Sequence, residues 1–417
     1  MSDETPQLTN LGAVTEVITK GTTPTTIAGS FTHEGTAFIK VETIDTDGGI
    51  VAEKLAFIDS HTHSLLKRSQ LKEHDVLFSI AGVIGRTAII KQSMLPANTN
   101  QAIAILRPKI GLLDPQFLYY YLRSPHFLDY SLGRVVQTAQ ANVSLSELRI
   151  APIKLPHMMI QRKIAAILSA YDDLIENNTR RIKILEETAQ TIYREWFVNF
   201  RFPGHQEVRL VNSELGKIPE GWNILNLFDI AEVTYGFPFK SRLFSSRHSG
   251  LPVVRIRDIN LGYSSTYTPE EVDSKYILEN GDILVGMDGN FNMVKWAGGV
   301  ALLNQRVVRF RPKAAFGRYH LYLALKAPIH FFDSTVVGTT VAHLSDEDLR
   351  SIDLPLPRSN DTKLIYDTFE PLLDLEINLR MKNTLLRQAR DLLLPHLISG
   401  ELDVSDFDIV INGSGGN

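Results

Sequence analysis

The segment Asn100-Gln-Ala-Ile-Ala-Ile-Leu-Arg-Pro-Lys109 recurs 204 residues later as Asn304-Gln-Arg-Val-Val-Arg-Phe-Arg-Pro-Lys313. Upstream, His74-Asp-Val-Leu77 matches Gly281-Asp-Ile-Leu284, and Ile39–Asp45 matches Val254–Asn260. Downstream, Ser144–Arg149 matches Ser345–Arg350, and Glu176, Asn178, Arg180, Leu185 and Ala189 recur with an offset of 200. Because the order of these matches never breaks, we infer that one ancestral unit was duplicated and then acquired loop insertions and deletions.

The first part of each copy has the pattern of short strands separated by Gly, Asn and Asp turns. Strands are expected at Ala37–Val41, Asp75–Ile80, Ile153–Pro156, Leu251–Ile256, Asp282–Val285 and Leu354–Pro357. A helix fits Pro115–Arg123 and its counterpart Tyr319–Ala327, and Ser144 and Ser345 each begin a capping-box pattern. This order predicts a compact α+β domain that is used twice.

The second part of each copy has the pattern of one long helix. No Pro or Gly interrupts the chain from Gln161 to about Phe200, and apolar residues recur every seven positions in the second copy. A sustained seven-residue period is typical of a coiled-coil seam, although packing in an ordinary helix bundle is an open alternative. Asn178 falls on the seam, where a polar residue would help to fix the register, and Pro371 predicts a kink or a helix restart. The predicted seam residues are Ile164, Tyr171, Leu174, Leu185, Ile192, Leu372, Leu379, Leu386 and Leu393.

These patterns predict an α+β fold in which two similar α/β domains are separated by two long antiparallel coiled-coil helices, related by a pseudo-twofold internal repeat. The expected boundaries are 1–157 for the first domain, 158–201 for the central helix, 202–358 for the second domain, 359–404 for the C-terminal helix, and 405–417 for a disordered tail. Because the first domain lacks the Ile-Pro-x-Gly-Trp lead of the second, its opening strand is expected to be short.

Composition excludes several classes of protein. The chain has 417 residues, 44% hydrophobic and 22% charged, which fits a soluble globular protein rather than a disordered one. It has no cysteine, which excludes a thiolate metal site and thiol chemistry. No apolar run approaches the roughly 20 residues of a membrane span, and no secretory signal is visible, so a cytoplasmic location is expected.

Two similar domains held apart by helices suit duplex DNA, whose half-sites present the same groove to one side about one helical turn apart. The net charge of −4 means that contact with DNA would need a local basic surface. Residue types that donate to phosphates and base edges cluster in the expected loops of both domains. The candidate DNA-contacting residues are Lys20, Arg86 and Gln137 in the first domain, and Lys240, Arg242, Arg255, Arg257, Asn290 and Asn292 in the second.

The sequence lacks the motifs of a self-sufficient enzyme. It contains neither a Gly-x-Gly-x-x-Gly dinucleotide motif nor a phosphate-binding P-loop, and it lacks the Asn/Asp-Pro-Pro-aromatic tetrapeptide of amino-methyltransferases. His61-x-His63 has the spacing of metal ligands, but no third ligand accompanies it. We therefore expect no catalytic residue, no metal and no cofactor on this chain, and a role in recognition.

The segment Gln388-Ala-Arg-Asp-Leu-Leu-Leu-Pro-His-Leu-Ile-Ser-Gly-Glu-Leu-Asp-Val404 resembles the C-terminal signature of the specificity subunits of type I restriction-modification systems. Asp172-Asp-Leu-Ile-Glu-Asn-Asn178, Arg194-Glu-Trp-Phe197 and Phe202-Pro-Gly-His205 resemble their central spacer. Ser213–Trp222 resembles the entry to their second target-recognition domain. The resemblance covers essentially the whole chain.

The resemblance implies that each target-recognition domain reads one half of a bipartite, asymmetric DNA site, and that the paired helices set the gap between the half-sites. It implies two copies of a modification subunit, docked on the helices, that bring S-adenosylmethionine and methylate adenine at N6. A restriction subunit would use ATP and Mg to cleave unmodified DNA. This chain would be the non-catalytic specificity subunit. The alternative from another class is a coiled-coil assembly adaptor that does not bind DNA.

Overall fold

The computed structural model describes residues 7–27, 29–134, 142–313, 316–335, 343–357 and 362–409. The chain divides into two compact units, and each combines one α/β domain with parts of both long helices. Unit 1 consists of Met1–Ile175 and Leu386–Asn417, and unit 2 of Glu176–Leu385.

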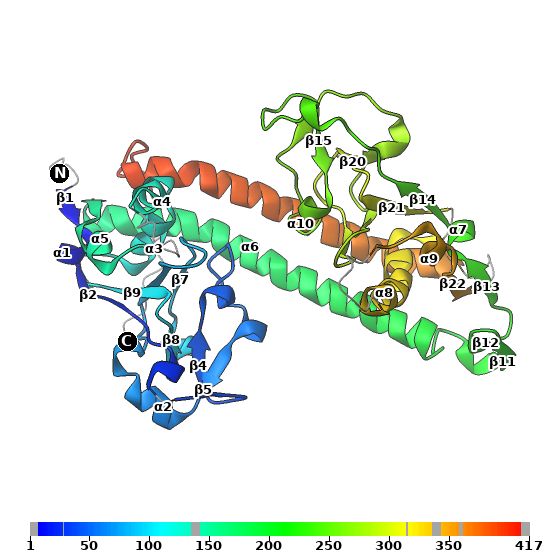
Figure 1. Ribbon diagram of the computed structural model, residues 1–417, viewed down its shortest axis with the longest axis horizontal. Helices are drawn as coiled ribbons and strands as arrows, with labels where there is room; N and C mark the ends of the chain where they lie inside the picture. The colour runs from blue at the N-terminus through cyan, green and yellow to red at the C-terminus, as the bar shows by residue number, and fades with distance from the viewer. Residues whose placement is uncertain are drawn as a thin grey trace. The chain divides into compact units, whose positions relative to one another are not determined.

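The α/β domain of unit 1 contains two four-stranded sheets, ordered β2-β9-β6-β7 and β3-β5-β4-β8, and a separate pair β1-β10 (Figure 1). Its elements are β1 (Gln7–Asn10), α1 (Leu11–Val14), β2 (Thr15–Lys20), β3 (Phe31–Thr32), β4 (Thr36–Ile39), β5 (Ala56–Ile58), α2 (Ser60–Leu65), β6 (Val76–Ser79), β7 (Thr87–Ile89), β8 (Ala97–Thr99), β9 (Ile103–Pro108), α3 (Pro115–Arg123), α4 (Pro125–Leu132), α5 (Leu145–Ile150) and β10 (Pro152–Leu155). Most pairs are antiparallel, and β4 pairs with β8 in parallel.

The α/β domain of unit 2 repeats this topology. Its sheets are ordered β14-β21-β18-β19 and β16-β15-β20-β17, a pair β13-β22 corresponds to β1-β10, and β15 pairs with β20 in parallel. Its elements are β13 (Asn223–Asn226), α7 (Leu227–Ile230), β14 (Ala231–Tyr235), β15 (Leu251–Val254), β16 (Tyr267–Thr268), β17 (Ile277–Leu278), β18 (Ile283–Gly286), β19 (Met293–Lys295), β20 (Ala301–Leu303), β21 (Val307–Pro312), α8 (Arg318–Thr335), α9 (Asp346–Arg350) and β22 (Asp353–Leu356). A hairpin of β11 (Leu210–Ser213) and β12 (Gly216–Pro219) precedes them.

Matched polar contacts confirm the internal repeat at the level of single atoms. Arg107 donates two hydrogen bonds of 2.7 Å to Asp75, whose side chain is fully buried. At the equivalent place Arg311 holds Asp282 through Nε and Nη2, the latter at 2.8 Å. Each aspartate also accepts a hydrogen bond from the backbone amide three residues earlier. The two domains therefore share a built-in ionic pair as well as their order of strands.

Local sequence signals explain the helix boundaries. Asp114 accepts hydrogen bonds from two backbone amides at the start of α3, which spans the predicted Pro115–Arg123. Ser144 caps α5, and Ser345 makes the full reciprocal capping box with Asp348 at α9. The predicted helix Tyr319–Ala327 is longer in the structure, because α8 continues to Thr335 with Pro328 inside it.

The two long helices are α6 (Met158–Tyr193), which ends in a π-helical turn at Arg194–Val198, and α10 (Thr362–Ser399). Both agree with the predicted helices to within a few residues. Within unit 1, Lys163 of α6 donates to the Ser405 carbonyl just after α10, and Asp172 binds Arg390, so the helices pair antiparallel. Within unit 2, Asn178 contacts Asn383 while Glu186 contacts Arg380, which is again antiparallel.

The buried positions of the helices correct the sequence alignment by one residue. Seven buried residues of α6 recur as buried residues of α10 with an offset of 201, whereas the matching letters have an offset of 200. Glu176 is accordingly exposed while Glu376 is fully buried. The matched α6 residues are Gln161, Ile164, Leu168, Ile175, Asn178, Ile182 and Ala189, and their α10 counterparts are Thr362, Ile365, Phe369, Glu376, Leu379, Asn383 and Arg390.

Most predicted seam residues lie where the sequence placed them. Ile164 and Leu379 are buried, and Tyr171, Leu185, Ile192, Leu372, Leu386 and Leu393 are half-buried. Leu174 is a correction, because it is 53% exposed and its neighbour Ile175 takes the seam position. Asn178 is buried, and its amide nitrogen donates to Asn383 Oδ1 at 2.9 Å, as expected of a polar seam residue.

Two further expectations need correction. Of the kink or restart expected at Pro371, the restart is excluded, because α10 continues through this residue. Because Pro371 and Asp367, whose carbonyl loses its partner, are both exposed, water can replace the missing hydrogen bond. Strand β1 has four residues, as many as its counterpart β13, so the opening strand is not shortened. The predicted tail 405–417 lies mostly outside the described residues.

Candidate nucleic-acid interface

The predicted DNA-contacting residues of the first domain have different surroundings. Lys20 ends β2 and is half-buried. Arg86 is turned inward, because its Nη1 donates to the carbonyls of Val41 and Ile44. This geometry corrects our expectation for Arg86, which supports the turn after β4 instead of presenting its guanidinium to a ligand. Gln137 lies outside the described residues.

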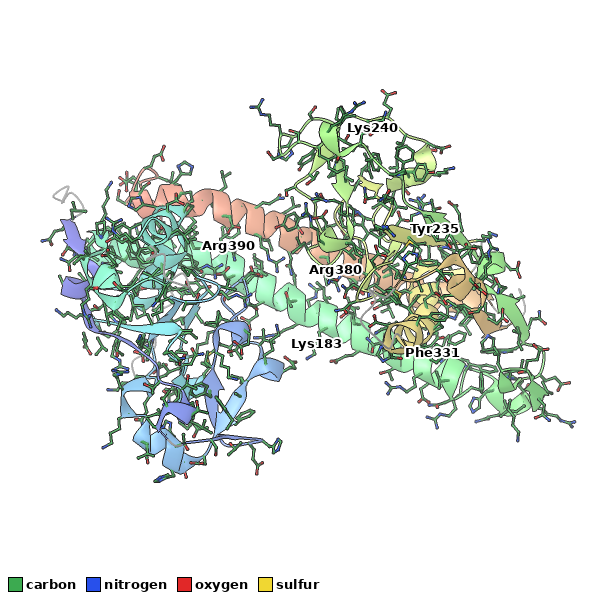
Figure 2. The ribbon with its side chains drawn as sticks, viewed as in Figure 1. Lys183, Tyr235, Lys240, Phe331, Arg380 and Arg390 are labelled. Carbon is green, nitrogen blue, oxygen red and sulfur yellow. The ribbon has the colours of Figure 1, made fainter. Side chains whose placement is uncertain are left out.

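The four basic candidates of the second domain lie around β15, and Figure 2 labels Lys240 there. Lys240 is 60% exposed and lies 3.6 Å from Glu270. Arg242 is exposed, and Arg257 is 68% exposed with its Nε 4.0 Å from Asp258. Arg255 is committed to the protein, because its Nε donates to Asp258 at 3.0 Å and its Nη2 donates to Thr266 at 2.5 Å. Three of the four side chains are therefore available for phosphate contacts.

Asn290 and Asn292 lie on the turn between β18 and β19. Phe291 anchors this turn, because its ring is buried and its amide donates to Asp333 at 3.0 Å. Gly289 has a φ of +74°, a conformation that L side chains rarely adopt, so the turn requires glycine there. Asn290 is exposed on this rigid turn, while Asn292 is half-buried. A fixed turn that presents an amide is suited to hydrogen bonds with base edges.

The sequence reasoning missed some basic residues of the first domain. Arg68 lies just after α2 and donates to the Thr22 hydroxyl at 3.3 Å, which brings it close to the end of β2 and to Lys20. Lys67 beside it is exposed. Their only signal in the sequence was the adjacent pair of cations, because their closeness to Lys20 depends on strand pairing. The structure thus adds Lys67 and Arg68 to the basic surface of this domain.

A charged cluster, which we call the first ionic cluster, links the α/β domain of unit 1 to the helices. It consists of Asp47, Asp172, Arg387 and Arg390. Arg387 lies 2.8 Å from Asp47, and Arg390 lies 2.6 Å from Asp172 and 3.5 Å from Asp47. Tyr120 donates to Asp172 at 2.6 Å. Burial alone would raise the pKa of Asp47, but Arg387, Arg390 and Arg123 lower it below its usual value.

A second ionic cluster links the α/β domain of unit 2 to the helices. It consists of Glu186, Lys295, Glu376 and Arg380. Lys295 comes from β19 and is almost completely buried, with its Nζ 3.2 Å from Glu186 and 3.1 Å from Glu376. Arg380 lies 2.8 Å from both glutamates. Burial would raise the pKa of Glu186, but Lys295 and Arg380 lower it. Figure 2 shows Arg380 and Arg390 on α10, one in each cluster.

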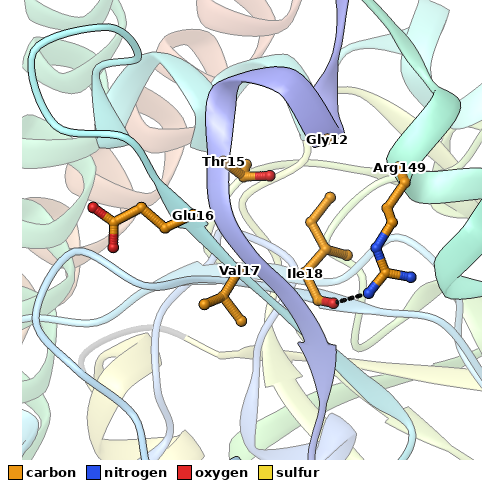
Figure 3. Close-up of a pocket in the computed structure, with 6 residues that line it drawn as sticks. All are labelled: Gly12, Thr15, Glu16, Val17, Ile18 and Arg149. Atoms are coloured by element: carbon orange, nitrogen blue, oxygen red, sulfur yellow. Dashed lines mark hydrogen bonds between the residues drawn. The ribbon is translucent and has the colours of Figure 1, made fainter.

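Two small cavities that are open to solvent lie among the described residues. One of about 270 Å³ lies in unit 1 beside Gly12, Thr15 and Arg149, and Arg149 donates to the Ile18 carbonyl at 2.6 Å (Figure 3). Another of about 220 Å³ lies in unit 2 and is lined by aromatic residues that include Trp196, Phe202 and Trp222. Among the described residues, no three His, Asp or Glu side chains gather as metal ligands, and no helix is both long and apolar enough to span a bilayer.

Comparison with known proteins agrees with this architecture. The family model described as the type I restriction modification DNA specificity domain matches residues 8–187 and 219–387. The MjaIX specificity subunit of a type I restriction enzyme from Methanocaldococcus jannaschii is 28% identical over 345 residues, 80% of this chain and 78% of that protein. The EcoBI specificity subunit from Escherichia coli is 32% identical over 198 residues, 46% of this chain and 42% of that protein.

Among solved structures, the type I restriction-modification system S subunit from M. genitalium has a similar fold, with a TM-score of 0.57 and 17% sequence identity. That similarity covers 95% of this chain and 97% of the other. The two matched stretches of the family model coincide with the two halves of the internal repeat. The chain belongs to the family of type I restriction-modification specificity subunits and carries two copies of the DNA specificity domain.

Proposed function

We propose that this protein is the DNA-reading subunit of a type I restriction-modification complex, and that each α/β domain reads one half of a bipartite, asymmetric site. The observation that carries the proposal is the duplication of a DNA specificity domain in one chain. A duplicated chain differs from a homodimer because its two domains can diverge. The exposed polar residues have diverged, with Lys67 and Arg68 in the first domain and Lys240, Arg242 and Asn290 in the second.

The paired helices would set the gap between the half-sites and dock two modification subunits. Each unit supports this role, because an ionic cluster joins its domain to α6 and α10. The modification subunits would supply S-adenosylmethionine and methylate adenine, and a restriction subunit would use ATP and Mg. The target base would be flipped into the pocket of the modification subunit, since its amino group cannot be reached inside the stack. This chain would then contribute specificity and no catalytic group.

Competition binding with randomised duplexes tests the proposal, using the complex of this chain with its modification subunit. We expect one bipartite sequence to be enriched, and the logarithm of the binding constant to fall linearly with the logarithm of salt concentration. Arg257→Ala should weaken binding and reduce the salt slope by about one if Arg257 contacts a phosphate. Arg255→Lys is the matched internal control. Equal affinity for all sequences would contradict the proposal, and the absence of salt-dependent DNA binding would favour the adaptor alternative.

A further inference from the structure

The two ionic clusters fix their domains with opposite charges. In unit 1 the domain supplies an acid, Asp47, and the helix supplies a base, Arg387, at 2.8 Å. In unit 2 the domain supplies a base, Lys295, and the helix supplies an acid, Glu186, at 3.2 Å. Both contacts lie beside a second buried helix charge, Arg390 in unit 1 and Glu376 in unit 2. The attachment of each domain therefore depends on a charge of a particular sign.

Glu186 and Arg387 occupy equivalent positions of the repeat. The buried residues of α6 and α10 correspond with an offset of 201, and the same offset relates residue 186 to residue 387. The next buried equivalent pair, Ala189 and Arg390, also differs in charge. The duplication thus placed the same helix position in both units, and the two copies now carry charges of opposite sign there.

The α/β domains differ at the matching places as well. Lys295 pairs with Ile283 across β18-β19, and the residue in the same register of the first domain is Ile89, paired with Val76. Asp47 follows the short 3-10 helix Val41–Thr43 by four residues. Its counterpart, four residues after the 3-10 helix Ile256–Asp258, is Gly262. The first domain therefore has no counterpart of the Lys295 charge, and the second has no counterpart of the Asp47 charge.

We propose that these charges make each recognition domain specific for its own half of the helix pair, so that a chain carrying a domain in the other half is destabilised. In an exchange, Glu186 would lose Lys295 and Arg387 would lose Asp47, with Ile89 and Gly262 in the places of the two partners. Glu376, whose side chain is fully buried, would lose Lys295 as well. Because the loss of a partner is most costly for a buried charge, specificity here comes mainly from the penalty that unit 2 imposes on the wrong domain. The assignment would also fix the order of the two half-sites, and that consequence alone rests on the proposed function.

A full-length chimera tests the assignment. In it, residues 7–155 replace residues 223–356, so that the first domain occupies both halves of the helix pair. Glu186→Arg should raise the melting temperature of this chimera by about 5 °C, because it gives the inserted Asp47 the partner that Arg387 provides in unit 1. The same change should lower the melting temperature of the parent chain by about 5 °C, because it replaces one of the two carboxylate partners of the buried Lys295 with a like charge. The proposal is wrong if Glu186→Arg destabilises the chimera as well as the parent chain, or if the chimera does not fold either with or without Glu186→Arg.

Charge reversals in the parent chain test each contact separately. Lys295→Glu with Glu186→Lys should melt several degrees higher than the sum of the single changes predicts, and so should Asp47→Arg with Arg387→Glu. The crossed combination of Asp47→Arg with Glu186→Lys should be additive, because its two sites lie in different clusters. Additive behaviour of the two within-cluster pairs would overturn the proposal. These melting experiments contain no DNA, so a failure of the proposed DNA reading would leave their results unchanged.

Discussion

His320 makes the stability of unit 2 sensitive to pH. It lies on α8, is almost completely buried, and its Nε2 has no hydrogen-bond partner among the described residues. Its neighbours are aromatic, with the ring centroid of Phe197 at 4.4 Å, of Tyr193 at 5.7 Å and of Phe369 at 6.2 Å. Burial in this apolar site lowers the pKa of His320 from 6.5 to about 3.

The lowered pKa of His320 determines whether the free energy of unfolding rises or falls with pH. Above pH 6.5 the histidine is neutral in both the folded and the unfolded chain, so it contributes no pH dependence. Between pH 6.5 and about pH 3 only the unfolded chain binds the proton, so the free energy of unfolding falls as the pH falls. The slope is about 1.4 kcal/mol per pH unit, which amounts to about 2 kcal/mol between pH 7.5 and pH 5.0.

Tryptophan fluorescence can isolate this effect, because Trp196, Trp222 and Trp296 all lie in unit 2. Urea unfolding followed by fluorescence at pH 7.5 and pH 5.0 gives the loss of stability for the parent chain and for His320→Gln. The variant should lose about 2 kcal/mol less than the parent over this interval. His330→Gln is the matched control, since His330 is an exposed residue of the same helix. An unchanged pH dependence in His320→Gln would refute the reasoning.

Three further predictions concern the helices and the domain cores. Asn178→Leu should destabilise unit 2 by about 1–3 kcal/mol in chemical denaturation, because Asn383 Oδ1 loses the donor that lies at 2.9 Å. The double variant Asn178→Leu, Asn383→Leu should recover most of that loss, and no recovery would show that the pair is not coupled. Seven helical residues can be inserted between Ile175 and Glu176, and seven more between Leu385 and Leu386, so that the heptad is kept. The preferred gap in the DNA should then lengthen by about three base pairs in competition binding. An unchanged gap would show that the paired helices do not set the distance between the half-sites. Asp75→Asn should destabilise unit 1 by about 3 kcal/mol, because Arg107 loses its buried partner, and the exposed Asp129→Asn should leave thermal unfolding unchanged.

Signals confined to neighbouring residues predicted much of the fold. The run Pro115–Arg123 is bounded by its own capping Asp114 and by Ser124, so its limits could be read directly from the sequence. The seven-residue period similarly placed Ile164 and Leu379 in the seam, because a helix repeats its faces without reference to the rest of the chain. The duplication was visible because the segments that carry Asp75 and Arg107 recur in order around Asp282 and Arg311, which form the same ion pair in the second domain.

Contacts between distant segments could not be predicted in this way. Arg86 lies in a loop with the composition of a DNA-contacting loop, but the carbonyls of Val41 and Ile44 reach its guanidinium only once the sheet has formed. Letter matching paired Glu176 with Glu376, whereas burial shows that the helices correspond one residue further along. Two charges that an apolar period does not anticipate, Glu376 and Arg390, lie buried in the seam because partners from elsewhere in their units neutralise them.

Methylation mapping tests the central claim most directly, namely that two dissimilar domains of one chain read the two halves of one site. The host genome would be sequenced with detection of modified bases, with the intact system present and with the triple variant Lys240→Ala, Arg242→Ala, Asn290→Ala. We expect a methylated sequence with two specified parts separated by a fixed gap, and a variant whose specificity is relaxed in one part while the other part and the gap are unchanged. A methylated sequence without a gap, or a variant that changes both parts equally, would contradict the account.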